Sequence, residues 1–180
     1  MRAIVTSIGE STTELCEWSL HRLGFRVQTI RSGTSLWGKL QTIFDIESLI
    51  GEDFLRVDAD VIVNKNVLEL IELKDLWWYQ GLTFDWNKQD ISHGGIQFIR
   101  SEAIPAIKRH INEARNMERP ESYLSRLEEF HNPRRFGTFE KICGLHSYKQ
   151  DDIERIKATK YRRGHYDDYD WELAERISVL

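Results

Sequence analysis

Apolar residues in the first third of the chain follow two alternating spacings. Short β-prone apolar runs occupy residues 2–8, 25–30 and 54–63. Between these runs, apolar side chains recur at helical spacing over residues 15–23 and 36–44. Strands that alternate with short helices are typical of α/β domains with a parallel sheet. The pattern therefore predicts the order β-α-β-α-β for this part of the chain.

The rest of the chain continues to alternate between helical and strand-like segments. It predicts helices over residues 67–76, 101–111 and 121–130, and strands over residues 77–86, 92–100 and 138–143. Residues 144–150 are predicted to form a loop, followed by a charged helical tail over residues 151–180. We therefore predict a single α/β domain with a mainly parallel, Rossmann-like sheet flanked by helices, and with a short mixed C-terminal part.

Composition fits one globular domain and argues against binding to nucleic acid. The chain has 180 residues, 41% of them hydrophobic and 30% charged, with a formal net charge of −4. No apolar run approaches the roughly 18 residues that a membrane span needs. Cys16 and Cys143 do not have metal-ligand spacing and are expected to be free thiols in a reducing compartment. The first residues lack a signal-peptide layout, so we expect a cytoplasmic protein.

Two carboxylates interrupt the third apolar run. In an extended strand Asp58 and Asp60 would point to the same face. They lie toward the carboxyl end of the strand, where open α/β sheets bind ligands. Two like charges so close together favour a positive partner, and a divalent cation with a phosphate-bearing ligand would supply one. The alternative is that the strand ends near Asp58 and both side chains face water.

Two later segments point to the same chemistry. Gly94 and Gly95 precede a strand, and paired glycines let the backbone approach a ligand closely. His146 lies in the predicted late loop, with Lys149 three residues further on. Each feature also has a simpler interpretation, since glycine pairs often form tight turns and a single histidine is often structural.

Four features, taken in order, resemble nucleotide-sugar-dependent glycosyltransferases of the GT-A type. They are the Asp58-Ala59-Asp60 motif, the aromatic strand, the Gly94-Gly95-Ile96-Gln97-Phe98 segment and the late Gly144-Leu145-His146. The resemblance covers most of the chain. It implies a manganese or magnesium ion held by Asp58, Asp60 and His146, which bridges the diphosphate of a donor that is usually UDP-linked. It also implies a nucleotide- and metal-binding half over residues 1–65 and a sugar and acceptor half over residues 77–150.

The resemblance assigns further residues to the donor and to catalysis. The implied donor-binding set is Thr6, Ser7, Lys39, Asp58, Ala59, Asp60, Gly94, Gly95 and Lys149. Glu121, which follows Pro120, and Asp85 in the aromatic strand are the candidates for a catalytic base. Glu121 also fits an ordinary first-turn acid that the helix dipole favours. The chain is short for this family, so a saccharide, lipid or protein acceptor would be recognised by a few loops, a partner chain or a membrane surface.

Three other functions remain open at this point. A catalytically degenerate module would bind a sugar nucleotide without turnover. A nucleotidylyltransferase of related fold would need a basic, Gly-rich phosphate loop after the first strand, and residues 9–13 contain no Lys or Arg. An Asp-x-Asp phosphatase would carry its carboxylate pair after the first strand rather than the third. The sequence favours the metal-dependent glycosyltransferase.

Overall fold

The structure is a computed structural model that describes residues 1–7, 9–31, 36–117 and 120–148. Lys149 and the predicted tail over residues 151–180 lie outside the described residues. The described strands are β1 (Arg2–Ser7), β2 (Arg26–Arg31), β3 (Phe54–Asp58), β4 (Val61–Val63), β5 (Trp78–Asp85), β6 (Asp90–Ile99) and β7 (Phe136–His146). The described α-helices are α1 (Thr13–Arg22), α2 (Leu36–Ile50), α3 (Asn66–Leu70), α4 (Ile104–His110) and α5 (Pro120–Ser125).

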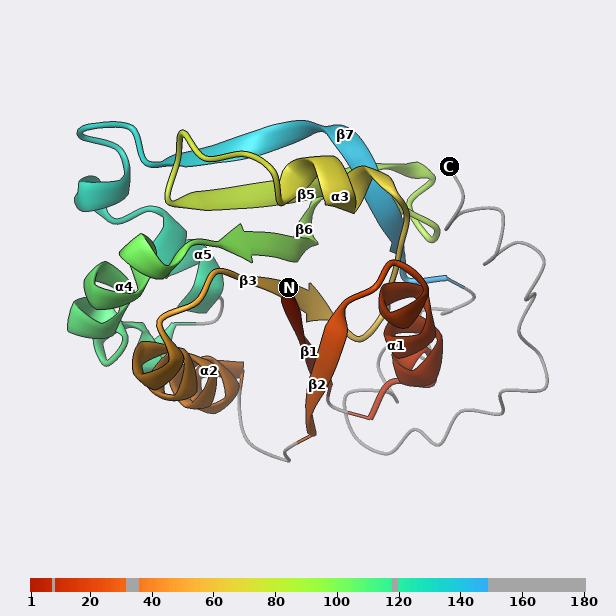
Figure 1. Ribbon diagram of the computed structural model, residues 1–180, viewed down its shortest axis with the longest axis horizontal. Helices are drawn as coiled ribbons and strands as arrows, with labels where there is room; N and C mark the ends of the chain where they lie inside the picture. The colour runs from red at the N-terminus through yellow and green to blue at the C-terminus, as the bar shows by residue number, and fades with distance from the viewer. Residues whose placement is uncertain (8, 32–35, 118–119, 149–180) are drawn as a thin grey trace.

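The predicted β-α-β-α-β order of the first half is confirmed. β1 lies between β2 and β3 and runs parallel to both (Figure 1). Its register places Thr6 opposite Asp58 at the carboxyl end of β3. The first two helices begin and end close to their predicted limits, although α2 continues to Ile50.

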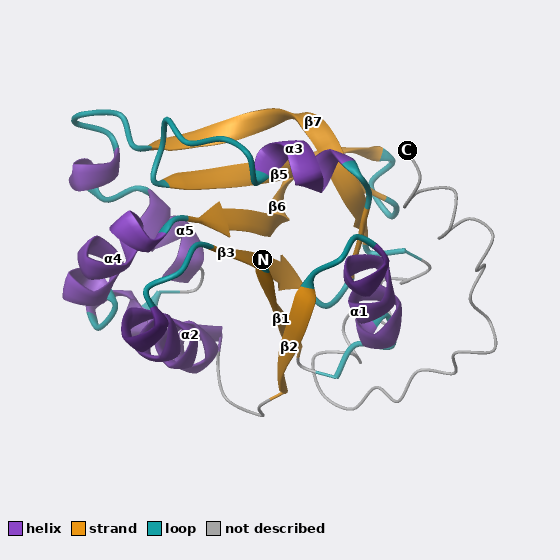
Figure 2. Cartoon of the chain, in the orientation of Figure 1, coloured by secondary structure: helices purple, strands orange, loops and turns teal. Residues whose placement is uncertain are grey.

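Helices cover the two faces of this part of the sheet, as expected for an α/β domain (Figure 2). Alternate residues of β1 pack in two separate hydrophobic cores, because successive side chains of a strand point to opposite faces. Ala3 and Val5 pack in the core that contains Cys16 of α1, whereas Ile4 packs in the core that contains Phe44 of α2. No helix in the described parts of the chain is long and apolar enough to cross a membrane.

The prediction of a mainly parallel sheet is wrong, because the sheet is mixed. Its strand order is β2-β1-β3-β6-β5-β7-β4. The pairs β1–β2, β1–β3 and β5–β7 are parallel, whereas β3–β6, β5–β6 and β4–β7 are antiparallel. β5 and β6 are joined by a short polar turn over residues 86–89, and so short a connection permits only an antiparallel pair.

The single strand predicted over residues 54–63 is also wrong. β3 ends at Asp58, the chain turns at Ala59 and Asp60, and β4 then pairs with β7 at the other end of the strand order. Every residue from Val61 to Val63 is fully buried, as are Phe54 and Leu55. The alternative that the strand ends near Asp58 is therefore correct for β3, and the two buried apolar pieces on either side of the carboxylates lie in separate parts of the sheet.

Two further boundaries differ from prediction. Residues 144–146 belong to β7 rather than to a loop, and α3 ends at Leu70 instead of continuing to residue 76. Cys16 and Cys143 are buried free thiols, as expected, and burial raises the pKa of Cys143 to about 12.

The β4–β7 pair depends on a glycine. A Cβ at Gly144 would lie 2.6 Å from the backbone oxygen of Ile62 and 3.0 Å from Val61 Cγ1. We predict that Gly144→Ala lowers the free energy of unfolding by about 1–3 kcal/mol, because two paired backbones must separate. Chemical denaturation would measure this loss. Lys141→Ala on the same strand is the control, and its exposed ion pair with Glu69 contributes about 1 kcal/mol or less. Equal stability of the two variants would contradict the prediction.

Candidate functional site

Five of the residues predicted from the sequence line one cavity of about 380 Å³. They come from different elements: Asp58 ends β3, Gly94 and Gly95 lie in β6, Glu121 begins α5, and His146 ends β7. The described residues around the cavity are charged, polar or glycine. A cavity with such a lining suits a ligand rich in hydroxyl groups or charge better than an apolar one.

Gly95 brings the backbone of β6 close to the predicted metal ligands. Its φ is +77°, a conformation that favours glycine. A Cβ there would lie 2.6 Å from Val61 Cγ2, 3.7 Å from His146 Cδ2 and 3.8 Å from Asp58 Oδ2. The glycine therefore serves a close approach, and Asp58 and His146 lie beside the same point of the backbone.

Asp58 is held by an arginine that the sequence interpretation did not single out. Its Oδ1 lies 2.6 Å from Arg56 Nη2 and accepts a hydrogen bond of 2.8 Å from Thr6 Oγ1. Arg56 is only 2% exposed and donates through Nη1 to Gln97 Oε1 at 2.9 Å. A charged residue within a buried strand was the available signal, because such a residue needs a partner.

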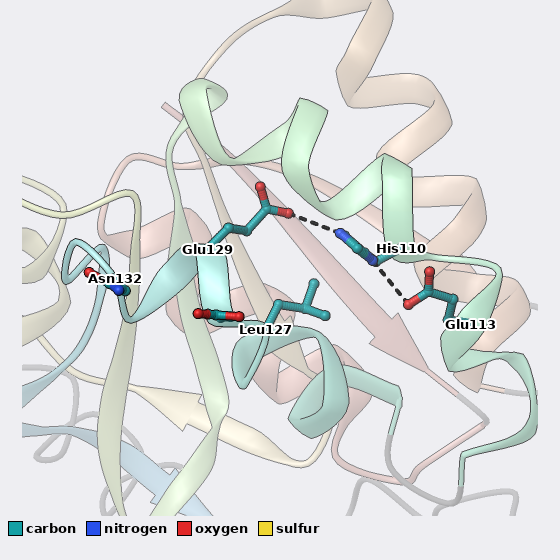
Figure 3. Close-up of a pocket in the computed structure, with 6 residues that line it drawn as sticks. His110, Glu113, Leu127, Glu129 and Asn132 are labelled. Carbon is teal, nitrogen blue, oxygen red and sulfur yellow. Dashed lines mark hydrogen bonds and ion pairs between the residues drawn. The ribbon is translucent and has the colours of Figure 1, made fainter.

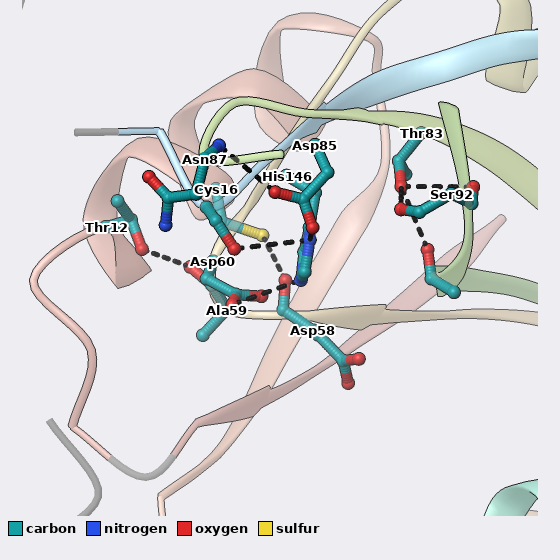
Figure 4. A network of polar contacts seen from close by, with 12 residues as sticks. Thr12, Cys16, Asp58, Ala59, Asp60, Thr83, Asp85, Asn87, Ser92 and His146 are labelled. Carbon is teal, nitrogen blue, oxygen red and sulfur yellow. Dashed lines mark hydrogen bonds and ion pairs between the residues drawn. The ribbon is translucent and has the colours of Figure 1, made fainter. Parts of the chain in front are cut away.

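His146 lies between two carboxylates at the end of β7 (Figure 4). Its Nε2 is 3.2 Å from Asp60 Oδ2, and its Nδ1 is 3.1 Å from Asp85 Oδ2. Strand register explains the arrangement, since His146 pairs with Asp85 of β5 on one side and with Val61 of β4, the residue after Asp60, on the other. Asp85 is almost fully buried, and Lys88 Nζ lies 3.1 Å from its Oδ2.

These contacts shift the pKa values of both partners. Burial by itself lowers the pKa of His146, but the hydrogen bonds and charges of Asp60 and Asp85 outweigh it and raise that pKa to about 9. Burial by itself raises the pKa of Asp85, but hydrogen bonds from Lys88 and His146 outweigh it and lower that pKa below its usual value. His146 is therefore a cation between two anions in this arrangement.

Two of the three predicted metal ligands, Asp60 and His146, are spaced as neighbouring ligands of a divalent ion would be, but His146 Nε2 must first release its proton to bind one. Neighbouring ligands at about 2.1 Å from an octahedral ion are separated by about 3 Å, which is close to the Asp60–His146 distance. A hydrogen bond from the other ring nitrogen to a carboxylate, as Asp85 provides, is typical of metal-binding histidines. Asp58 differs, because its Oδ1 is occupied by Arg56 and its carboxylate points away from that of Asp60 (Figure 4). Among the described residues, no three His, Cys, Asp or Glu side chains form a ready metal-binding group.

The turn between β3 and β4 is fixed by backbone contacts. The Ala59 N–H donates to the Thr6 carbonyl oxygen at 3.1 Å, and the Thr12 hydroxyl donates to the Ala59 carbonyl oxygen at 3.0 Å. The Ser147 N–H donates to the Asp60 carbonyl oxygen at 2.9 Å. Because Asp60 lies in this turn and not in an extended strand, Asp58 and Asp60 do not point to the same face as the sequence predicted.

The remaining predicted residues near the end of β1 lie beside this turn rather than in the cavity. Lys39 on α2 is 2% exposed, and its Nζ donates to the Ser7 carbonyl oxygen at 2.5 Å. Burial lowers the pKa of Lys39, and the charges of Glu10 and Asp58 oppose this shift. The Thr6 side chain contacts Asp58, which places the end of β1 next to the candidate site.

Glu121 has a carboxylate oxygen, Oε2, that is buried without a hydrogen-bond partner among the described residues. It lies in the first turn of α5, so the helix-dipole interpretation still applies. Glu121 also lines the cavity, and a buried carboxylate oxygen with unused acceptor capacity calls for a partner that a small rotation of the side chain would bring within reach.

A second cavity, of about 510 Å³, lies away from the predicted residues (Figure 3). It contains His110, whose Nδ1 is 3.0 Å from Glu113 Oε2 and whose Nε2 is 3.2 Å from Glu129 Oε1. Arg109 also pairs with Glu129 at 2.5 Å. These ion pairs join α4 to two later 3₁₀ turns, Glu113–Asn116 and Glu128–Phe130, and are explained as packing contacts.

No protein-family model matches the sequence, and no curated protein sequence matches it significantly. Solved structures do match. A glycosyltransferase involved in glycosylation of the major capsid of PBCV-1 has a TM-score of 0.59 and 15% identity, over 89% of this chain and 100% of that chain. 4-Diphosphocytidyl-2C-methyl-D-erythritol synthase from Anaerococcus prevotii has a TM-score of 0.59 and 10% identity, over 89% and 94%.

The glycosyltransferase GlyE from Streptococcus pneumoniae, in its apo form, has a TM-score of 0.51 and 13% identity. The match covers 99% of this chain and 60% of GlyE. At these identities the likeness concerns the fold. The chain thus has a fold shared by glycosyltransferases and nucleotidyltransferases, in agreement with the GT-A resemblance at that level.

The raised pKa of His146 predicts how stability depends on pH. A histidine whose folded-state pKa exceeds its unfolded value of about 6.5 contributes stability fully below that value. The contribution is lost as pH rises through the folded-state value of about 9. We predict that the free energy of unfolding, measured with a chelator present, falls by about 1–3 kcal/mol across this window.

His146→Asn is the comparison for this measurement, because asparagine keeps a polar side chain without a titrating group. Its unfolding free energy should change much less between these pH values. An equal pH dependence in the two proteins would show that His146 is not the group responsible.

Proposed function

We propose that this protein transfers a sugar from a nucleotide-diphosphate sugar, with UDP as the expected nucleotide, to a hydroxyl group of a saccharide, lipid or protein acceptor. The proposal rests mainly on one observation: Asp58, Gly95, Glu121 and His146 come from four separate elements and line one polar cavity. The shared fold with glycosyltransferases supports it.

Asp60 and His146 are the proposed protein ligands of a manganese or magnesium ion. When bound, such an ion would neutralise the diphosphate, which stabilises the charge that develops as the diphosphate leaves. Asp85 would hold the His146 ring through Nδ1 and so direct Nε2 toward the ion. This gives Asp85 a positioning role in place of the catalytic-base role considered for it from the sequence.

The polar cavity is the proposed site of the transferred sugar and the acceptor hydroxyl. Gly94 leaves open space for the sugar, since nothing lies within 4 Å of the position that a Cβ would take, whereas Gly95 brings the backbone close to Asp58. Glu121 is the proposed general base, because it lines the cavity and its carboxylate, once an oxygen turns toward the cavity, would accept a hydrogen bond, and then the proton, from the acceptor hydroxyl.

The second candidate function is nucleotidyl transfer, which the match to 4-diphosphocytidyl-2C-methyl-D-erythritol synthase favours. That reaction needs a basic loop that binds a triphosphate after the first strand. Residues 9–13 contain no Lys or Arg, and Lys39 is buried against the Ser7 carbonyl oxygen. Release of pyrophosphate from a nucleoside triphosphate and a sugar phosphate would identify this alternative.

A panel of nucleotide sugars incubated with Mn²⁺ tests the proposed function. We predict metal-dependent hydrolysis of at least one donor, and we expect Asp60→Ala to abolish it because a proposed ligand is lost. Asp90→Asn, a change at an exposed carboxylate at the start of β6, is the control and should leave the rate unchanged. If no donor is bound or hydrolysed by the unaltered protein, the proposal is wrong. If donor binding occurs without turnover, the degenerate binding module replaces it.

The role of Glu121 has its own test. We predict that Glu121→Gln lowers the transfer rate by about 10²–10⁴-fold, the range typical of a lost general base, while the affinity for the nucleotide stays the same. Glu128→Gln is the control for the loss of charge, because Glu128 is an exposed glutamate three residues after the end of α5 at Ser125. An unchanged rate in Glu121→Gln would contradict the assignment.

A further inference from the structure

Arg56 is a fully buried cation whose guanidinium reaches the candidate site. It is 2% exposed and lines the same cavity as Asp58, Gly95 and His146. Its neighbours in β3, Leu55 and Val57, are buried in the apolar core. Burying a charged side chain costs free energy unless it is paired, so the partners of Arg56 indicate its role.

Arg56 contacts side chains of three strands, and the shortest of these contacts is to one oxygen of Asp58. Nη2 lies 2.6 Å from Asp58 Oδ1, and Thr6 Oγ1 donates to the same oxygen at 2.8 Å. Gln97 Oε1 fixes Nη1 at 2.9 Å from the neighbouring strand β6, opposite Arg56 in the register. Three strands thus hold the guanidinium against a carboxylate that is itself 34% exposed.

This arrangement opposes cation binding in two ways. The Asp58 oxygen that Arg56 occupies is already used as an acceptor, and the fixed positive charge repels a second cation nearby. By contrast, an anionic diphosphate would be attracted to the guanidinium. Arg56 therefore weakens binding of the cation by itself, whereas a bound diphosphate would strengthen binding of the cation, and the cation would strengthen binding of the diphosphate.

We propose that Arg56 sets the divalent-cation affinity of the site by holding Asp58. The nucleotide-free protein binds the cation weakly, through Asp60 and His146, and binds it well only together with a diphosphate. This inference rests on the proposed function. It gives Arg56 a role beyond that of a buried ion pair, which would stabilise the fold without affecting cation affinity.

The test is a titration of the full chain with Mn²⁺ alone, followed by electron paramagnetic resonance of the free ion. Arg56→Gln removes the charge and releases Asp58, and we expect it to bind Mn²⁺ more tightly than the unaltered protein by on the order of tenfold. The double variant Arg56→Gln with Asp58→Asn has the same net charge as the original pair, so its affinity should return to the unaltered value. An Arg56→Gln protein that binds Mn²⁺ no more tightly overturns the proposal.

Thr6→Val provides a second variant in case Arg56→Gln does not fold. It removes the other hydrogen bond to Asp58 Oδ1 without changing charge or shape, and we expect a gain in Mn²⁺ affinity of about threefold. In that case an unchanged affinity of Thr6→Val overturns the proposal. The titration is repeated with UDP present to test the proposed function separately. If neither the unaltered protein nor any variant binds UDP, the proposed function is wrong. The role of Arg56 is decided by the titrations with Mn²⁺ alone.

Discussion

The position of the candidate site depends on the turn that the chain makes at Ala59 and Asp60. The turn is held on both sides, because the Ala59 N–H donates to the Thr6 carbonyl oxygen of β1 and the Ser147 N–H donates to the Asp60 carbonyl oxygen. The chain then leaves the parallel strands and joins the opposite edge of the sheet as β4. Asp60 is thereby placed next to the end of β7, within hydrogen-bond reach of His146.

Every carboxylate at this turn has a cationic neighbour within the protein. Arg56 balances Asp58, His146 lies between Asp60 and Asp85, and Lys88 adds a second contact to Asp85. Such pairing allows these three carboxylates to lie close together before a ligand arrives, because each charge is compensated. A divalent ion would enter by replacing some of these internal partners.

The sequence and the family resemblance predicted which residues lie together better than they predicted the path of the chain. Helical and β spacings located the first three strands, and the family resemblance selected Asp58, Gly95 and His146, which the structure brings together. The end of β3 at Asp58 was one of the two alternatives that the sequence left open, whereas the pairing of β4 with β7 was not predicted, since both apolar pieces are buried and look alike in the sequence. The antiparallel pairs and the role of Arg56 depend on contacts between distant segments, which spacing along one chain does not reveal.

In the proposed function, the diphosphate of a donor and a divalent ion meet at Asp60 and His146. A crystal structure of the protein with UDP and Mn²⁺ would test this claim. We predict an ion within about 2.0–2.4 Å of Asp60 and His146, with diphosphate oxygens completing its coordination and the cavity beside Gly95 free for the sugar. UDP bound elsewhere, or an ion with neither residue among its ligands, would contradict the claim.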